Sequence, residues 1–291
     1  MFPEPTVKNA IAYRLREPLL RPFCDSHTVL AQHKVPLRIR RDMRTRYVAA
    51  SLGKPKTKNE ERLCAFKNCY QGGEIWLIGN GPSLNELDLS FLKDQVTIGT
   101  NGIFLASEDF GFNVTHYVVE DFLVAEDRSS AIQDLRESQV WVGNYLNYCL
   151  SPLPEAIWLN VSPFLPRLRK SPKFSFDASR ILYSGGTVTY LCLQLAYFFG
   201  AQRVNLIGFD HNYEEPDSGA RFGSILTSHQ PDRNHFRNDY FGPGFRWHRP
   251  RLERMERAYR VAREVYEGSG RCIVNRGVGG SLEVFAREPL L

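Results

Sequence analysis

The sequence predicts an α/β protein built on a doubly wound, mostly parallel, Rossmann-like sheet. Continuous apolar runs such as IWLI at 75–78 and VNLI at 204–207 end at glycines, as expected for strands that are covered on both faces. Helical stretches lie between most of these runs, and this alternation is typical of parallel sheets. Of the 291 residues, 43% are hydrophobic and 24% are charged, which is ordinary for a globular chain and enough to form a core.

The predicted strands and helices follow one another from residue 74 onwards. Strands are predicted at 74–79, 95–99, 115–119, 139–143, 156–160, 203–208 and 271–275. Helices are predicted at 83–93, 102–108, 127–137, 186–199 and 249–267. The last helix has Pro250 at its start and Gly268 past its end, and its Glu/Arg pairs at a spacing of four indicate a partly exposed helix.

The first 72 residues are predicted to form a basic N-terminal extension, and residues 73–291 a Rossmann-like domain with a lid at about 212–248. Lysines and arginines gather within 14–58, although the net charge of the whole chain is only +5. We expect a basic helix near 38–52, a linker at 54–60 and a short helix at 60–70. Such charge suits a membrane surface, nucleic acid or an acidic polymer, or it belongs to a solvated arm. No nucleic-acid-binding motif accompanies it, so we expect no nucleic-acid partner.

The six cysteines are dispersed and lack the His or Cys pairing that a zinc site needs. No signal sequence opens the chain, and no apolar run approaches the length of a membrane span. We therefore expect reduced cysteines and a cytoplasmic protein. Peripheral contact with the inner membrane face through residues 14–58 is one interpretation of the basic charge.

Polar residues follow four of the predicted strands, and in an open α/β sheet ligands bind beyond that edge. The glycines of the first turn permit a phosphate or sugar to approach the backbone. Ser83 is expected to cap the following helix, whose N-terminus favours an anion. A sharp structural turn is the alternative. The residues are Gly79, Asn80, Gly81 and Ser83, then Asn101, then Glu120 and Asp121, and finally Asp210 and Tyr213.

Two further segments are expected to join this edge. Ser184, Gly185, Gly186 and Thr187 precede an apolar helix, where they can hold a carboxylate or phosphate or simply cap the helix. The loop NHFRNDYFGPGFRWH at 234–248 is rich in His, Asn, Tyr and Gly, a composition typical of a functional lid. Its two histidines, His235 and His248, are candidates for acid–base work, because histidine is the residue type suited to proton transfer near neutral pH.

These motifs resemble those of two related groups of proteins. IWLIGNGPSL, TNGIF and VNLIGFDHNY are similar to segments of the small bacterial sialyltransferases, which use CMP-sialic acid, adopt a Rossmann-like variant of the GT-A fold and need no metal. With GGTVTYLCLQLAYFFGA and NRGVGGSLEVFARE, they also resemble the superfamily of 6-hydroxymethylpterin diphosphokinases and motility accessory factors. The resemblance covers residues 74–288, and the N-terminal part matches neither group.

The resemblance implies a role for each site residue. The nucleotide would lie against Asn80, Gly81, Ser83, Asn101 and Asp210, the donor's carboxylate against Ser184, Gly185 and Gly186, and the leaving phosphate against Tyr213 or Tyr240. His248, just before the long C-terminal helix, would be the general base, with His235 upstream in the same lid. These three lid residues, His248, His235 and Tyr240, are the predicted catalytic residues.

The function implied first is that of an inverting glycosyltransferase, which moves an acidic, sialic-acid-like or ulosonic sugar from a CMP donor to a glycan acceptor without a required cofactor. The chain departs from the sialyltransferases at Glu120–Asp121, where they carry an asparagine. An acidic pair could bind a divalent ion. The alternative is therefore Mg²⁺-dependent pyrophosphoryl transfer from ATP, with Glu120, Asp121 and Asp210 around the metal. A non-catalytic nucleotide-sugar-binding protein is the third hypothesis, and an oligomer is compatible with all three.

Overall fold

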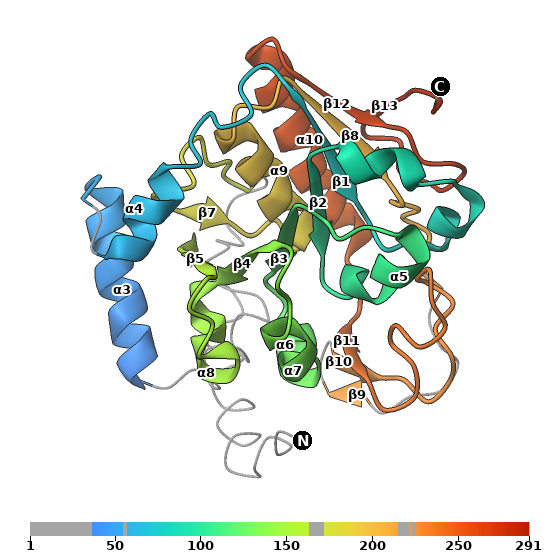
Figure 1. Cartoon of the computed structure of the whole chain (residues 1–291), viewed down its shortest axis with the longest axis horizontal. Helices are drawn as coiled ribbons and strands as arrows, with labels where there is room; N and C mark the ends of the chain where they lie inside the picture. The colour runs from blue at the N-terminus through green and yellow to red at the C-terminus, as the bar shows by residue number, and fades with distance from the viewer. Residues whose placement is uncertain (1–36, 55–56, 163–171, 215–220, 223–224, 291) are drawn as a thin grey trace.

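The structure, a computed structural model, describes residues 37–54, 57–162, 172–214, 221–222 and 225–290. Its centre is an eight-stranded sheet in the order β13-β12-β8-β1-β2-β3-β4-β5 (Figure 1). Every neighbouring pair in that sheet is parallel. The strands are β1 Glu74–Ile78, β2 Thr97–Thr100, β3 His116–Val119, β4 Gln139–Gly143, β5 Ile157–Leu159, β8 Arg203–Ile207, β12 Cys272–Asn275 and β13 Ala286–Arg287.

The strand order confirms the predicted fold class and locates its switch point. All seven predicted strands are present, and β13 is the one strand of this eight-stranded sheet that was not expected. From β1 the chain adds β2 to β5 on one side, and β8, β12 and β13 then follow on the other side. The direction of winding therefore reverses between β1 and β8. In doubly wound sheets this reversal opens a crevice at the carboxyl ends of the two strands.

The helices lie close to their predicted positions, although several are shorter. Two of the predicted helices are replaced by short 3₁₀ turns, alone or followed by a single α-helical turn. The α-helices are α3 Leu37–Ser51, α4 Lys58–Cys64, α5 Ser107–Phe110, α6 Phe122–Asp127, α7 Ser129–Gln133, α8 Asn147–Leu150, α9 Val188–Phe198 and α10 Leu252–Gly268. The 3₁₀ helices are η1 Pro82–Glu86, η2 Ser90–Asp94, η3 Ile103–Ala106 and η4 Asn144–Leu146.

Local capping explains two of the differences. The helix predicted at 83–93 is interrupted because the Asp88 carboxylate accepts a hydrogen bond from Ser90 N at 2.9 Å, a turn that competes with helix. The helix predicted at 127–137 begins earlier, at Phe122. There Asp121 is the N-cap, and its Oδ1 accepts from Leu123 N at 2.7 Å.

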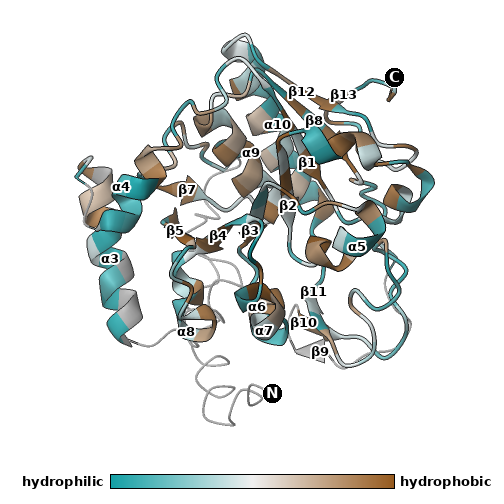
Figure 2. Cartoon of the chain, in the orientation of Figure 1, coloured by the Kyte–Doolittle hydropathy of each residue, from teal (hydrophilic) through white to brown (hydrophobic). Residues whose placement is uncertain are grey.

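Helices α9 and α10 cover the sheet as two layers. Most of α9 is fully buried, since it lies between the sheet and α10, and Figure 2 shows it as predominantly hydrophobic. In α10 one stripe is buried and the opposite face is charged, as expected for an outer helix. The buried stripe consists of Met255, Ala258, Tyr259, Ala262 and Tyr266.

The described part of the predicted basic extension is attached to the sheet. Asn59 of α4 covers the edge strand β5, because its side chain accepts from Trp158 N at 2.7 Å and donates to Trp158 O at 2.8 Å. Arg46 of α3 forms an ion pair of 2.6 Å with the buried Glu60. Leu63 belongs to the main core. Residues 1–36 and 55–56, which include much of the predicted membrane-contact region, lie outside the described residues.

Short strands outside the central sheet complete the fold. A three-stranded antiparallel sheet contains β9 Arg221–Phe222, β10 Ile225–Thr227 and β11 Arg246–His248, and β6 Val161–Ser162 pairs with β7 Leu182–Tyr183. Strand β11 lies beside α6 (Figure 1). Among the helices of the described ranges, none combines the length and the apolar character needed to cross a membrane.

Candidate active site

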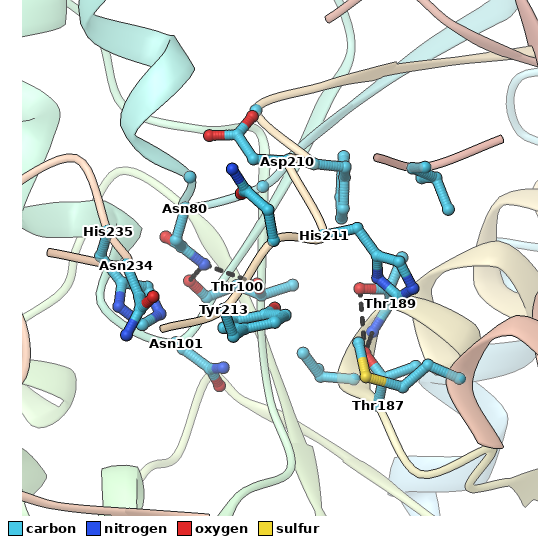
Figure 3. A pocket seen from close by; sticks show the side chains of 18 of the residues that line it. Asn80, Thr100, Asn101, Thr187, Thr189, Asp210, His211, Tyr213, Asn234 and His235 are labelled. Carbon is cyan, nitrogen blue, oxygen red and sulfur yellow. Dashed lines mark hydrogen bonds between the residues drawn. The ribbon is translucent and has the colours of Figure 1, made fainter. Parts of the chain in front are cut away.

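A pocket opens at the switch point between β1 and β8, where the sequence predicted a site (Figure 3). Its cavity volume is about 100 Å³, several times the 10–15 Å³ that holds one water molecule. Five segments form most of its lining: Gly79 to Gly81, Thr100 and Asn101, Thr187 to Thr189, Gly208 to Tyr213, and Asn234, His235 and Tyr240. Met255, Tyr259 and Leu282 complete the lining. Nine of the sixteen predicted site residues are therefore brought together: Gly79, Asn80, Gly81, Asn101, Thr187, Asp210, Tyr213, His235 and Tyr240.

The turn after β1 is closed by Asp210. The Asp210 carboxylate accepts hydrogen bonds from Ser83 N at 2.9 Å and from the Ser83 hydroxyl. A Cβ at Gly81 would lie 2.5 Å from the same carboxylate, so glycine is required there for Asp210 to approach. The expectation that Ser83 caps the following helix is wrong, because η1 has no side-chain cap. Asp210, rather than a ligand anion, occupies this first turn.

Two asparagines place amide oxygens without partners in the pocket. Asn80 Nδ2 donates to Thr100 O at 3.2 Å, which fixes the orientation of the amide because a carbonyl can only accept. Asn80 Oδ1 and Asn101 Oδ1 are then buried with no hydrogen-bond partner. Asn101 has φ 55°, a conformation that asparagine tolerates better than most residues. Because unpaired buried acceptors are costly, both oxygens favour a ligand that donates hydrogen bonds.

A carboxylate–histidine pair faces these asparagines from the lid segment. His235 Nδ1 lies 2.8 Å from Asp232 Oδ2, and Asp232 is buried. Burial acts to raise the pKa of Asp232, but the bond to His235 and its backbone donors outweigh burial and hold this pKa below its usual range. A carboxylate that accepts a hydrogen bond from Nδ1 keeps the proton of the neutral ring on that nitrogen. Nε2 is then the nitrogen that can accept a proton.

Tyr240 supports this histidine rather than presenting its own hydroxyl. The rings of His235 and Tyr240 stack with centroids 4.1 Å apart. The Tyr240 hydroxyl accepts from Gly102 N at 2.9 Å, and the side chain is 1% exposed. Burial raises the pKa of this hydroxyl above its usual range.

The segment around His235, which lies within the predicted lid at 212–248, is held against the β1 turn and α6 by backbone and side-chain contacts. Phe236 N donates to Asn80 O at 2.9 Å, and Asn85 Nδ2 donates to Phe236 O at 2.8 Å. These bonds hold the residue after His235 against the β1 turn. At the other end, Arg246 Nε lies 3.0 Å from Asp127 Oδ1, and the Arg128 guanidinium donates to Tyr240 O.

Seven predicted site residues do not line this pocket: Ser83, Glu120, Asp121, Ser184, Gly185, Gly186 and His248. His248 lies in β11, 3.8 Å from Asp121 Oδ2 and edge-on to Phe122. Asp121 caps α6. Glu120 is buried, and its backbone carbonyl accepts from the Tyr145 hydroxyl at 2.5 Å.

The segment before α9 contributes through Thr187 rather than through its glycines. A Cβ at Gly185 would lie 2.6 Å from the Ala258 Cβ, so this glycine permits α10 to pack closely. The Ser184 hydroxyl accepts from Gly186 N at 3.4 Å within the same turn. Thr187 caps α9 and bonds to Thr189 at 3.1 Å, and both threonines line the pocket.

The acidic residues named for Mg²⁺ do not form a metal site. Glu120, Asp121 and Asp210 are all described, and within the described ranges no three His, Cys, Asp or Glu side chains converge as metal ligands. Asp210 and Asp121 are each committed to backbone donors. The residues present therefore do not fit a magnesium ion held by these three carboxylates.

Sequence reasoning missed Asp232 and gave His211 no role. Asp232 precedes His235 by three residues in PDRNHF, and this spacing was the available signal for the pair. His211 lies in the strand-end motif GFDHNY, but its carboxylate neighbour Glu256 lies on α10, and nothing near His211 in the sequence indicates it.

Comparison with known proteins gives a distant likeness among solved structures. No protein-family model matches the chain, and no curated protein matches it either. Among solved structures, the chain is similar to a MAf glycosyltransferase from Magnetospirillum magneticum AMB-1, at 13% sequence identity and a TM-score of 0.41. The match covers 79% of this chain and 38% of the chain of that structure.

Proposed function

We propose that the chain is a glycosyltransferase that moves an acidic, sialic-acid-like sugar from a CMP-activated donor to a hydroxyl group of a glycan acceptor. The observation that carries the proposal is the Asp232–His235 pair beside the unpaired oxygens of Asn80 and Asn101 at the switch point. Ligands of doubly wound sheets bind at this position, and a histidine with a buried carboxylate is equipped to take a proton.

The pocket suits the nucleotide end of such a donor. Amide oxygens only accept hydrogen bonds, so the ligand must donate at two points. The hydroxyl groups of a ribose and the amino group of a cytosine are such donors. Tyr213, 36% exposed at the pocket, offers an aromatic face on which a base can stack. The choice of CMP and of an acidic sugar comes from the sequence motifs.

In this mechanism His235 is the general base, the role that the resemblance gave to His248. His235 Nε2 accepts the proton of the acceptor hydroxyl while that oxygen attacks the anomeric carbon of the sugar. The bond from this carbon to the phosphate oxygen breaks, and the anomeric configuration inverts. Proton transfer of this kind contributes about 10²- to 10⁴-fold to a rate. No metal enters these steps.

The test is nucleotide release from a panel of CMP-, UDP- and GDP-sugars and ATP, each with glycan acceptors and with or without Mg²⁺. We expect CMP release without Mg²⁺ and a fall of about 10²- to 10⁴-fold in His235→Gln. His229→Gln is the matched control, because His229 is exposed and does not line the pocket. His248→Gln should keep most of the turnover.

Three outcomes would contradict the proposal in different ways. Mg²⁺-dependent AMP formation from ATP would replace it with pyrophosphoryl transfer. Binding of CMP in a thermal-shift assay without turnover on any acceptor would favour a nucleotide-sugar-binding protein. Full turnover by His235→Gln, with loss of turnover in His248→Gln, would identify His248 of β11 as the general base.

A further inference from the structure

A second histidine–carboxylate pair lies on the opposite side of the same pocket. His211 Nε2 is 3.5 Å from Glu256 Oε1 of α10. His211 is 8% exposed and lines the pocket with Thr187 and Thr189, and Figure 3 shows its ring near these two threonines and far from His235. Its φ of 56° is a left-handed conformation that is uncommon outside glycine and, where it occurs, is often found at functional sites.

The groups around His211 define its electrostatic environment. Glu256 is also bound by Arg260 of the same helix, at 2.7 Å, so its charge is shared. Tyr259 of α10 has its ring centroid 6.1 Å from that of His211, and Tyr213 lines the same pocket. The carboxylate of the preceding residue, Asp210, is committed to Ser83.

These surroundings favour a neutral imidazole until an anion arrives. Burial lowers the pKa of His211 below its usual range, although Glu256 acts in the opposite direction. A second negative charge next to the ring favours the protonated form. A phosphate in the pocket would therefore increase the proton occupancy of His211.

We propose that His211, which lies beside Glu256, is the general acid of the reaction: it contacts the leaving phosphate and gives it a proton. This inference rests on the proposed function, since it names the second proton-transfer group of the same site. The acceptor oxygen forms a bond to the anomeric carbon as the bond from that carbon to the phosphate oxygen breaks. The acceptor proton moves to His235, and the His211 proton moves to the released nucleoside monophosphate. Solvent then exchanges protons with both rings and restores the starting state.

The first consequence is that the nucleotide product binds together with a proton. Isothermal titration of the full chain with CMP at pH 7, in two buffers of different ionisation enthalpy, measures the protons taken up. We expect an uptake of several tenths of a proton per CMP in the wild type and none in His211→Gln. His229→Gln, which alters an exposed histidine outside the pocket, should keep the uptake.

The second consequence is a pH profile with two independent limbs. A general acid must be protonated, so turnover should fall at high pH, and a general base gives the fall at low pH. His211→Gln should lose the high-pH limb and about 10²-fold or more in kcat. Glu256→Gln keeps a hydrogen-bonding group beside the ring and removes its charge, so it should move that limb to lower pH. A purely structural role for His211 would leave the limb in place.

The outcomes separate this inference from the function on which it rests. CMP binding by His211→Gln with unchanged proton uptake, or an unchanged high-pH limb, would overturn the general acid and leave the glycosyltransferase standing. Failure of the wild type to bind CMP or to release it from a donor would overturn both. A folding defect in His211→Gln is recognised by circular dichroism, and Glu256→Gln then provides the test.

Discussion

Asp232 does not line the pocket, and its two oxygens accept hydrogen bonds from three donors within its own segment. These donors are His235 Nδ1 and Phe241 N on Oδ2, and Asn234 N on Oδ1. The carboxylate thus holds both the ring and the backbone of the segment around it. It acts on the reaction through His235, which makes it a positioning residue.

Asp232→Asn should therefore lower turnover without altering donor affinity. An amide NH₂ replaces one acceptor oxygen, so at least one of the three donors loses its partner at a cost of about 1–3 kcal/mol. Without the carboxylate the imidazole also loses its fixed tautomer, and kcat should fall about 10²-fold or more. Steady-state kinetics checks this: a changed KM for the donor with unchanged kcat would contradict it.

At the scale of single residues, the sequence predicted several of the side chains that line the pocket but not always what each one contacts. Asn80, Asn101 and Asp210 were located by the rule that strand ends meet at one edge. The role of Ser83 was wrong because its partner Asp210 lies 127 positions away. A contact over that distance is decided by the register of β1 and β8, which periodicity does not specify.

At the scale of elements, α6 anchors the end of the lid segment through charge. Arg246 lies beside β10 and forms ion pairs with Asp127 and with the buried Glu126, the latter at 3.0 Å. The Tyr148 hydroxyl donates to the other oxygen of Glu126 at 2.5 Å. The sequence predicted the start of this helix five residues too late, so it did not indicate that Asp127 ends the helix facing the lid.

Arg246→Ala should loosen the lid segment and raise the KM for the donor by about tenfold or more, because the change leaves a buried carboxylate without its cation. Limited proteolysis should show faster cleavage within 228–248. Arg233→Ala is the matched control, since Arg233 is an exposed arginine of the same segment. Equal proteolysis of the two variants would show that this ion pair does not hold the lid.

At the scale of the whole molecule, an aromatic cluster at the amino edge of the sheet joins the N-terminal segment to the core. His116 is 2% exposed; its Nδ1 accepts from Trp141 Nε1 at 3.2 Å, and its Nε2 lies 3.0 Å from the Tyr70 hydroxyl. Because Nδ1 accepts, a neutral ring donates from Nε2 to Tyr70. Burial lowers the pKa of His116 to about 4.

This histidine should make the fold sensitive to acid. The unfolded chain binds a proton at His116 below about pH 6.5, and the folded chain does so only near pH 4. The contribution of His116 to the free energy of unfolding is therefore fully present above about pH 6.5 and is lost as the pH falls towards 4. Between pH 7 and pH 5 the contribution to the free energy of unfolding should decrease by about 2 kcal/mol.

Urea unfolding at pH 7 and pH 5 measures this decrease. His116→Gln, which offers an acceptor and a donor but does not titrate, should lose about 2 kcal/mol less between the two pH values than the wild type. His229→Gln should behave as the wild type does. An equal pH dependence in all three proteins would mean that His116 is not the group responsible.

The Asn59 side chain has a consequence for how far the chain can be shortened. Its amide bonds the N–H and C=O of Trp158 as a neighbouring strand would, and so it ends the sheet at β5. A chain beginning after residue 64 would present an open strand edge, a surface on which other copies pair and aggregate. The described part of the predicted N-terminal extension thus covers the sheet edge and prevents self-association. Its removal should therefore appear first as insolubility rather than as lost activity.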